Sequence, residues 1–164
     1  MKALSLALFL ASLFAPFESL SASVLIGNGG SIQLGDGSLS LAGTELIVDG
    51  ELFVDNGAVD EAGAVNINGL LDGGNGEIGV VGDWVNAGQF LAASGRVLFF
   101  DDVGGVAQIS GPSIFNELSI ISPAGGRFVL ESGVAQRVNT ALTIQGVSGF
   151  PVQIESSNLP QIAE

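Results

Sequence analysis

The 164-residue sequence contains no cysteine, histidine or tyrosine, and only four of its residues are Lys or Arg. Without cysteine there are no disulfides, no thiolate nucleophile and no Cys-ligated metal. Without histidine there is no imidazole base, which excludes a Ser-His-Asp triad and a His-ligated zinc. We therefore expect no catalytic residues, no cofactor and no discrete metal centre.

Positive charge is scarce, because 17 acidic residues give a formal net charge of -13. Nucleic-acid binding needs a basic surface, and an anionic membrane surface would repel this chain. Hydrophobic residues make up 47% of the sequence, which argues against a disordered acidic tail. The composition favours an acidic, soluble domain.

Residues 1–22 have the pattern of a secretory signal peptide. Lys2 is followed by an apolar run over residues 3–15 and then by a segment of small residues that contains Ser21 and Ala22. The run is shorter than the roughly 20 apolar residues of a membrane-spanning helix. We expect cleavage after Ser21 or Ala22, secretion to the cell surface or medium, and no membrane insertion afterwards.

Glycines recur with a regular spacing of six or seven residues. Any three consecutive gaps sum to 19 or 20 residues. The glycines in this series are Gly30, Gly37, Gly43, Gly50, Gly57, Gly63, Gly69, Gly76, Gly82, Gly88 and Gly95. We interpret them as corners between short strands, where glycine supplies a positive φ.

Apolar residues stand two positions after ten of these eleven glycines, the exception being Glu45. The fourth position after each glycine is mostly apolar too, and this alternation predicts strands of about five residues with one buried face. The apolar second positions are Ile32, Leu39, Leu52, Val59, Val65, Leu71, Ile78, Trp84, Phe90 and Val97.

Three strands in each repeat predict an all-β fold, a three-sided parallel β-solenoid (β-helix). Each rung, meaning one full turn, has 19–20 residues, and residues 23–150 provide roughly six or seven rungs. After Phe99 the spacing loosens, and residues 151–164 are expected to form a cap or tail. A β-sandwich is the rival fold, but it gives no reason for a three-step period.

The residues before the corner glycines predict columns, meaning residues at the same position in successive rungs. Short polar side chains in one column are expected to form hydrogen-bonded ladders. The three predicted columns are Asp36, Asn56, Asn75 and Ser94; Asp49 and Asn68; and Ala42, Ala62 and Val81.

A second signal begins with Gly82-Asp83-Trp84, Asn86, Gly88 and Phe90, and continues with Ala107–Gly111 and Phe115–Ile120. This order resembles the GDW-N-G-F…Q-I-G…F-N-L-I repeat of large bacterial surface and adhesin-like proteins, over about residues 76–146. The resemblance implies a secreted β-solenoid and brings no catalytic residue with it.

Two carboxylates on one face can serve as acid and nucleophile in a polysaccharide-active β-helix enzyme. Asp101 and Asp102, with Arg96 or Arg127 nearby, are the candidates for this role. Adjacent residues of a strand point to opposite sides, so these two carboxylates form no dyad unless the chain bends. We therefore expect no enzyme, and fold analogy alone is a weak argument for one.

Other ligands have weaker patterns in the sequence. The Gly-rich segment 72–77 resembles a calcium repeat, but Ile78 stands at the expected Asp position. Diffuse divalent-cation binding by stacked acids remains open; the acids concerned are Asp49, Asp55, Asp60 and Asp72. Ice binding is disfavoured because the few threonines, Thr44, Thr140 and Thr143, do not follow the rung period.

Aromatic residues are expected mainly in the core. Trp84 and Phe90 occupy inward positions, which favours packing over carbohydrate stacking. Phe53 and Leu91 are outward residues on one side, two rungs apart, and can form an exposed apolar stripe. The other outward apolar residues are Leu70, Val85 and Leu98.

These patterns favour a secreted structural or adhesive protein at the bacterial surface or in the extracellular matrix. Its partners would be further copies of itself, or surface or matrix polysaccharide or protein. One alternative is a self-assembling filament subunit, because terminal rungs carry unpaired strand edges. The other is the polysaccharide-active enzyme.

Overall fold

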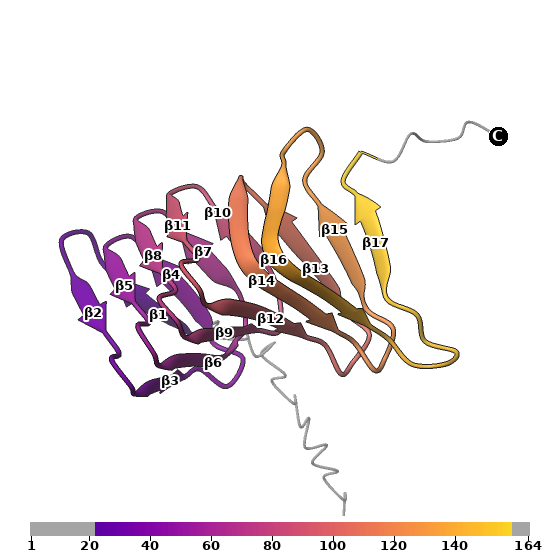
Figure 1. The fold of residues 1–164 in the computed structure, drawn as a ribbon, viewed down its shortest axis with the longest axis horizontal. Coiled ribbons are helices and arrows are strands. Elements are labelled where there is room, and N and C mark those ends of the chain that lie inside the picture. The colour runs from indigo at the N-terminus through magenta and orange to yellow at the C-terminus, as the bar shows by residue number, and fades with distance from the viewer. Residues whose placement is uncertain (1–21, 159–164) are drawn as a thin grey trace, which may run out of the picture.

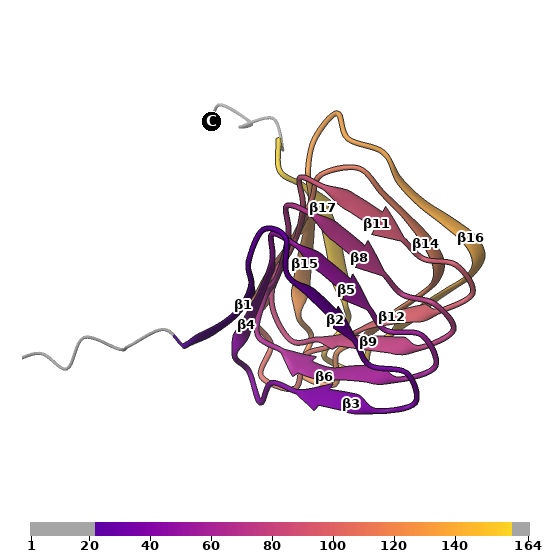
Figure 2. The same cartoon turned by 90° about the vertical axis from the view of Figure 1, so that its left-hand side faces the viewer.

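The computed structural model describes residues 22–158, in which every regular element is a β-strand. The strands form three parallel sheets wound into a three-sided solenoid of about six turns (Figures 1 and 2), which confirms the predicted fold class. Sheet A contains β1 (Ser23–Ile26), β4 (Glu45–Val48), β7 (Val65–Ile67), β10 (Trp84–Asn86), β13 (Val106–Ser110), β15 (Arg127–Leu130) and β17 (Gln153–Ser156). Sheet B contains β2 (Ser31–Gln33), β5 (Glu51–Phe53), β8 (Leu70–Asp72) and β11 (Gln89–Leu91). Sheet C contains β3 (Ser38–Ser40), β6 (Ala58–Ala62), β9 (Glu77–Val80), β12 (Arg96–Phe100), β14 (Ser113–Ile121) and β16 (Gln136–Gln145).

The strand register divides the rod into a regular and an irregular part. Glu51 pairs with Leu70 and Leu70 with Gln89, two steps of 19 residues. Trp84 pairs with Ile109, a step of 25 residues, because a loop is inserted between β12 and β13. The period predicted from the glycines therefore holds up to β12, and insertions lengthen the later rungs.

Columns of apolar side chains fill the centre of the rod. In sheet B, Leu52 and Leu71 are fully buried, and Phe90 of the next rung is 9% exposed. Val65 and Trp84 form the equivalent fully buried pair in sheet A. Each interior rung covers the apolar residues of the rung beneath it, which supplies the main favourable term in folding.

The corner glycines serve a purpose different from the one expected. Only Gly43 of the eleven has a positive φ, of 83°. At Gly57, Gly69 and Gly82, an added Cβ would instead overlap the carbonyl oxygen of the glycine one rung earlier. Glycine is required there because stacked corners bring two backbones into contact, and not because of the local dihedral angle.

Left-handed residues stack at the corner between sheets B and C. They lie two positions before the glycines at this corner, in turns closed by hydrogen bonds such as that from the Gly76 N–H to the Gly73 carbonyl, 3.0 Å. The left-handed residues are Gly35, Asp55, Gly74 and Ala93, with φ of 62°, 56°, 54° and 43°. Two of them are not glycine, so sequence inspection misses this column.

The polar column at the same corner is confirmed. The Asn56 amide donates to the Asp36 carboxylate at 3.0 Å and the Asn75 amide to the Asn56 side chain at 3.0 Å. The Ser94 hydroxyl donates to the Asn75 amide oxygen. In the second predicted column the Asn68 amide donates to Asp49 at 2.8 Å.

The predicted column of Ala42, Ala62 and Val81 is wrong by one residue. Ala62 pairs with Val80, and both are fully buried, whereas Val81 is 42% exposed. The cause is a β-bulge in β6, where Glu61 has a φ of 54° and adds one residue relative to β9.

An offset of one residue also occurs in β4. The sequence pattern assigned Glu45 to the inward face, but Leu46 and Val48 are the buried residues of this strand. Ala42 and Gly43 are consecutive left-handed residues, which lengthens this corner by one residue relative to the next rung.

Strands β14 and β16 run unbroken past the corner between sheets B and C (Figure 1). Their pairing contains a bulge after Phe115. At this corner the Asn116 amide donates to the Gly95 carbonyl at 3.4 Å, and the Thr140 hydroxyl donates to Asn116 at 2.6 Å. The polar corner therefore continues to the last rung. The segment expected as a cap or tail contains β17, which pairs with β15.

Candidate functional site

Three aromatic rings fill the core where the rungs begin to lengthen. Trp84 and Phe90 pack edge to face with ring centroids 4.9 Å apart, and Phe115 lies 5.6 Å from Trp84 and 5.7 Å from Phe90. Trp84 and Phe115 are fully buried, and the indole N–H donates to the Ser113 hydroxyl at 3.0 Å. The predicted core role of Trp84 and Phe90 is confirmed, and neither ring is presented to a sugar.

Asn86, part of the repeat motif, organises the turn that follows β13. It is 4% exposed, and its amide donates to the Pro112 carbonyl at 2.7 Å and to the Ser113 hydroxyl at 3.2 Å. An open groove beside it is lined by Phe90, Gln136 and other residues of β11, β14 and β16. The sequence marked Asn86 only as a motif residue and gave no sign of this bracing role.

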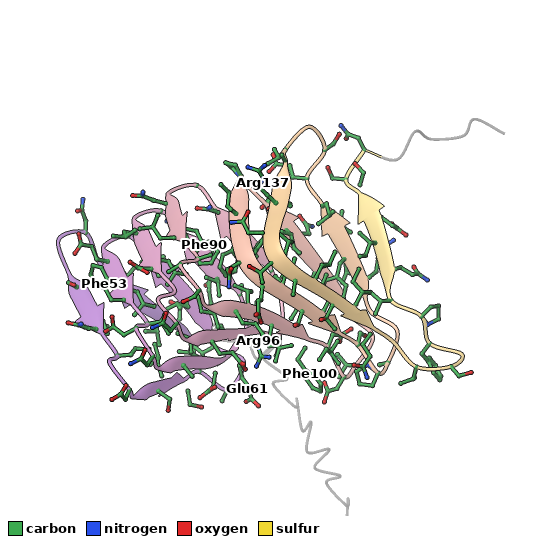
Figure 3. The ribbon with its side chains drawn as sticks, viewed as in Figure 1. Phe53, Glu61, Phe90, Arg96, Phe100 and Arg137 are labelled. Atoms are coloured by element: carbon green, nitrogen blue, oxygen red, sulfur yellow. The ribbon has the colours of Figure 1, made fainter. Side chains whose placement is uncertain are left out.

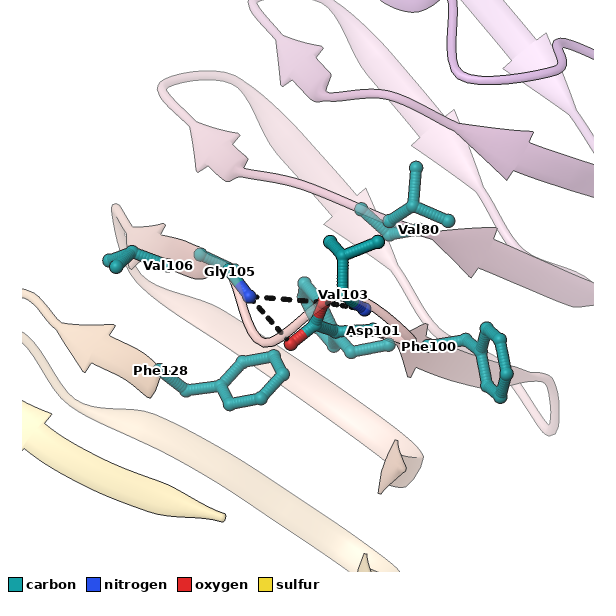
Figure 4. Close-up of a pocket in the computed structure, with 10 residues that line it drawn as sticks. Val80, Phe100, Asp101, Val103, Gly105, Val106 and Phe128 are labelled. Carbon is teal, nitrogen blue, oxygen red and sulfur yellow. Dashed lines mark hydrogen bonds between the residues drawn. The ribbon is translucent and has the colours of Figure 1, made fainter. Parts of the chain in front are cut away.

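The inserted loop after β12 folds around Asp101, which is 9% exposed (Figure 4). Its carboxylate accepts hydrogen bonds from the N–H groups of Val103, Gly104 and Gly105 at 3.0–3.2 Å. It also accepts one from the Ser122 hydroxyl at 3.1 Å. These donors occupy the Asp101 oxygens, so the carboxylate holds the loop in place.

Asp101 and Asp102 are not arranged as a dyad. Asp101 is buried among its loop donors, whereas Asp102 is exposed. The apolar cavity next to Asp101 has a volume of about 50 Å³ and is bounded by Val80, Val103 and Phe128, among others (Figure 4). That volume is close to the space of one or two water molecules and is far below the size of a sugar site.

The two arginines considered as partners of Asp101 pair with other acids. Arg96 bonds Glu77, one rung earlier in the same column, on the outer face of sheet C (Figure 3). This hydrogen bond and the charge of Glu77 raise the pKa of Arg96, so the guanidinium stays charged at every physiological pH. Arg127 lies 3.6 Å from Glu155.

The acids considered for divalent cations are spread along the rod. Asp72 accepts the N–H of Gly74 at 2.9 Å, and Asp55 accepts that of Gly35 at 3.3 Å, so both carboxylates support corner turns. Within residues 22–158, no three acidic side chains gather closely enough to hold a metal ion. Diffuse cation attraction by the acidic surface stays a prediction.

The predicted apolar stripe on sheet B is interrupted. Phe53 and Leu91 do share a column, as expected, but Asp72 pairs with both and lies between them. Phe53 is half-buried and Leu91 is 41% exposed. The face therefore alternates apolar and acidic side chains along the rod axis.

No family model, no curated protein and no solved structure matches this chain. In the part of the chain that the structure describes, no helix is long and apolar enough to cross a membrane.

Proposed function

We propose that the mature chain is a secreted structural or adhesive rod at the bacterial surface or in the extracellular matrix. It acts by presenting side chains at fixed spacing. The observation that carries this proposal is the polar corner column from Asp36 to Ser94, in which each side chain is hydrogen-bonded to the one in the preceding rung. Such a ladder fixes polar groups at the separation of adjacent parallel strands, about 4.8 Å.

A fixed array favours multivalent binding to a repetitive partner. Side chains that are already ordered lose little conformational entropy when they bind, and many weak contacts add through effective concentration. The alternation of Phe53, Asp72 and Leu91 on sheet B gives one face both apolar and charged positions. A polysaccharide of the cell surface or matrix offers the matching repetition of apolar ring faces and hydroxyl groups.

Export is tested by expressing the full chain in a bacterium and fractionating the culture. We expect the surface or medium fraction to contain a chain that begins at Ala22 or Ser23, as read by N-terminal sequencing. The control Leu8→Arg interrupts the apolar run and should leave the full-length chain inside the cell. Recovery of the uncleaved chain from the cytoplasm with both versions would contradict the proposal.

Adhesion is tested by measuring how much purified mature protein binds isolated cell-wall and matrix polysaccharides, with and without Ca²⁺. The variant Asp72→Asn with Leu91→Ser changes the face of sheet B and should reduce binding at least threefold, whereas Asp102→Asn should not. Polysaccharide chain length is followed in the same samples. Shortening of the polysaccharide that is lost in Asp101→Asn would favour the enzyme alternative instead.

A further inference from the structure

Both ends of the rod expose strand edges together with side chains that are buried in every interior rung. Ile32 of the first rung is 38% exposed, whereas Leu52 in the next rung is fully buried. At the other end Leu142 is 56% exposed, whereas Leu118 beneath it is 6% exposed. In the described chain, each end is therefore an apolar surface framed by unpaired backbone groups.

The two ends belong to the same columns. Leu39 in β3 and Leu142 in β16 are the first and last members of one inward column of sheet C. All pairing between strands of different rungs is parallel. The N-terminal end placed on the C-terminal end continues this pairing and these columns, whereas two like ends would meet in the opposite strand direction.

Charge separates the two ends in the same sense. Residues 23–62 contain seven acidic residues and no Lys or Arg. Residues 126–158 contain two acids and two arginines, so their formal charges cancel. Arg137 is exposed on β16 and forms no ion pair with any described residue (Figure 3). An acidic end repels its own kind and is attracted to an end that carries a free cation.

We propose that the protein assembles head to tail, with the N-terminal edges β1, β2 and β3 of one copy on the C-terminal edges β16 and β17 of the next. Each junction covers the exposed apolar residues of two terminal rungs and pairs two sets of strand edges. The inference rests on the rod architecture and on the charge distribution, and it does not depend on the adhesive role. It assigns the protein's own second copy as the partner of both ends.

Absence of cysteine makes a clean cross-linking experiment possible. Ser40 in β3 and Thr143 in β16 are exposed, outward-facing residues of sheet C, at opposite ends of the rod. Ser40→Cys, Thr143→Cys and the double variant are each purified as mature protein, oxidised at several protein concentrations and separated without reductant. Head-to-tail assembly predicts a ladder of multimers from the double variant, and monomers from each single variant.

The other outcomes overturn the proposal. Dimers from Ser40→Cys alone would show that two N-terminal ends pair, and dimers from Thr143→Cys alone that two C-terminal ends pair. Monomers from all three variants would show that the ends are covered in another way, for instance by residues 159–164 or by a different protein.

A second measurement uses no cysteine. Leu142→Glu puts a charge on the C-terminal edge and should lower self-association at least tenfold in analytical ultracentrifugation. The melting temperature should stay close to that of the parent, because Leu142 is already more than half exposed. The matched control Ser119→Glu adds the same charge to the outer face one rung inside and should leave association unchanged. Equal association of both variants would contradict the proposed junction.

Discussion

The rod consists of two parts that are stabilised differently. From β4 to β12 the rungs repeat almost every 19 residues, and stacked glycines and polar side chains hold the corners. From Asp101 to β17 the rungs are longer, and single buried groups such as Asp101 and Asn86 hold each irregular turn. Repetition lets one type of contact be reused, whereas each departure from it needs its own set of hydrogen bonds.

The difference predicts how substitutions act. In the regular part, a change at one position of a column disturbs the rungs on both sides of it. In the irregular part, the effect depends on whether the residue closes a loop. Four substitutions, each with a partner in the other part or beside it, test this contrast.

The largest effect is expected for Val65→Asp. Val65 is fully buried between Leu46 and Trp84, so an unpaired carboxylate there should cost about 4–5 kcal/mol or more and abolish cooperative unfolding. Val106→Asp, in the irregular part, changes a residue that is 52% exposed and should shift stability by about 0.5 kcal/mol. Urea denaturation followed by circular dichroism measures both. Equal stabilities would mean that Val65 does not face the core.

Glycine replacement should separate two reasons for glycine. A Cβ at Gly69 would overlap the Gly50 and Asp49 carbonyls, so Gly69→Ala should cost about 2–3 kcal/mol through forced backbone shifts. Gly133, in the later part, has open space but a φ of 78°, so Gly133→Ala should cost about 1 kcal/mol through dihedral strain. Thermal unfolding gives the order, and a larger loss at Gly133 would contradict the stacked-corner explanation.

The loop anchor is tested by Asp101→Ala. This change leaves the N–H groups of Val103, Gly104 and Gly105 without their acceptor and should cost about 2 kcal/mol. Hydrogen exchange of those amides should accelerate, whereas the regular rungs should keep their protection. Asp102→Ala is the matched control and should behave as the parent. Unchanged exchange in Asp101→Ala would remove the assigned role.

The smallest effect is expected in the polar corner column. Asn75→Ala removes hydrogen bonds to Asn56 and Ser94 at an exposed corner and should cost about 1 kcal/mol. Asn116→Ala, at the same corner of the irregular part, loses its contacts to Gly95 and Thr140 and should cost a similar amount. Chemical denaturation compares them. A loss confined to Asn75 would show that the column ends before the longer rungs.

Much of the fold follows from the sequence because one period governs both glycine and apolar spacing. The polar column from Asp36 to Ser94 was predictable from residue types and a 19–20-residue step alone. The corner between sheets C and A was not, because left-handed Ala42 and Glu61 add residues without any glycine to mark them.

The loop anchor also lay beyond the sequence pattern. Asp101 stood out only as one of two adjacent acids, and its contacts depend on how the inserted chain bends. A carboxylate that accepts several N–H groups of its own loop has no fixed sequence spacing. For that reason a catalytic interpretation and a structural one could not be separated before the geometry was known.

The central claim is that stacking continues in register across the boundary between the two parts, which makes one rod. The most direct measurement is disulfide formation within one molecule between paired residues of β12 and β14. Leu98→Cys with Ser119→Cys joins directly paired positions and should cross-link almost completely under mild oxidation, as judged by mass spectrometry. Leu98→Cys with Ile121→Cys is displaced by one pair and should remain largely reduced. Preferential cross-linking of the displaced pair, or of neither pair, would contradict the continuous rod.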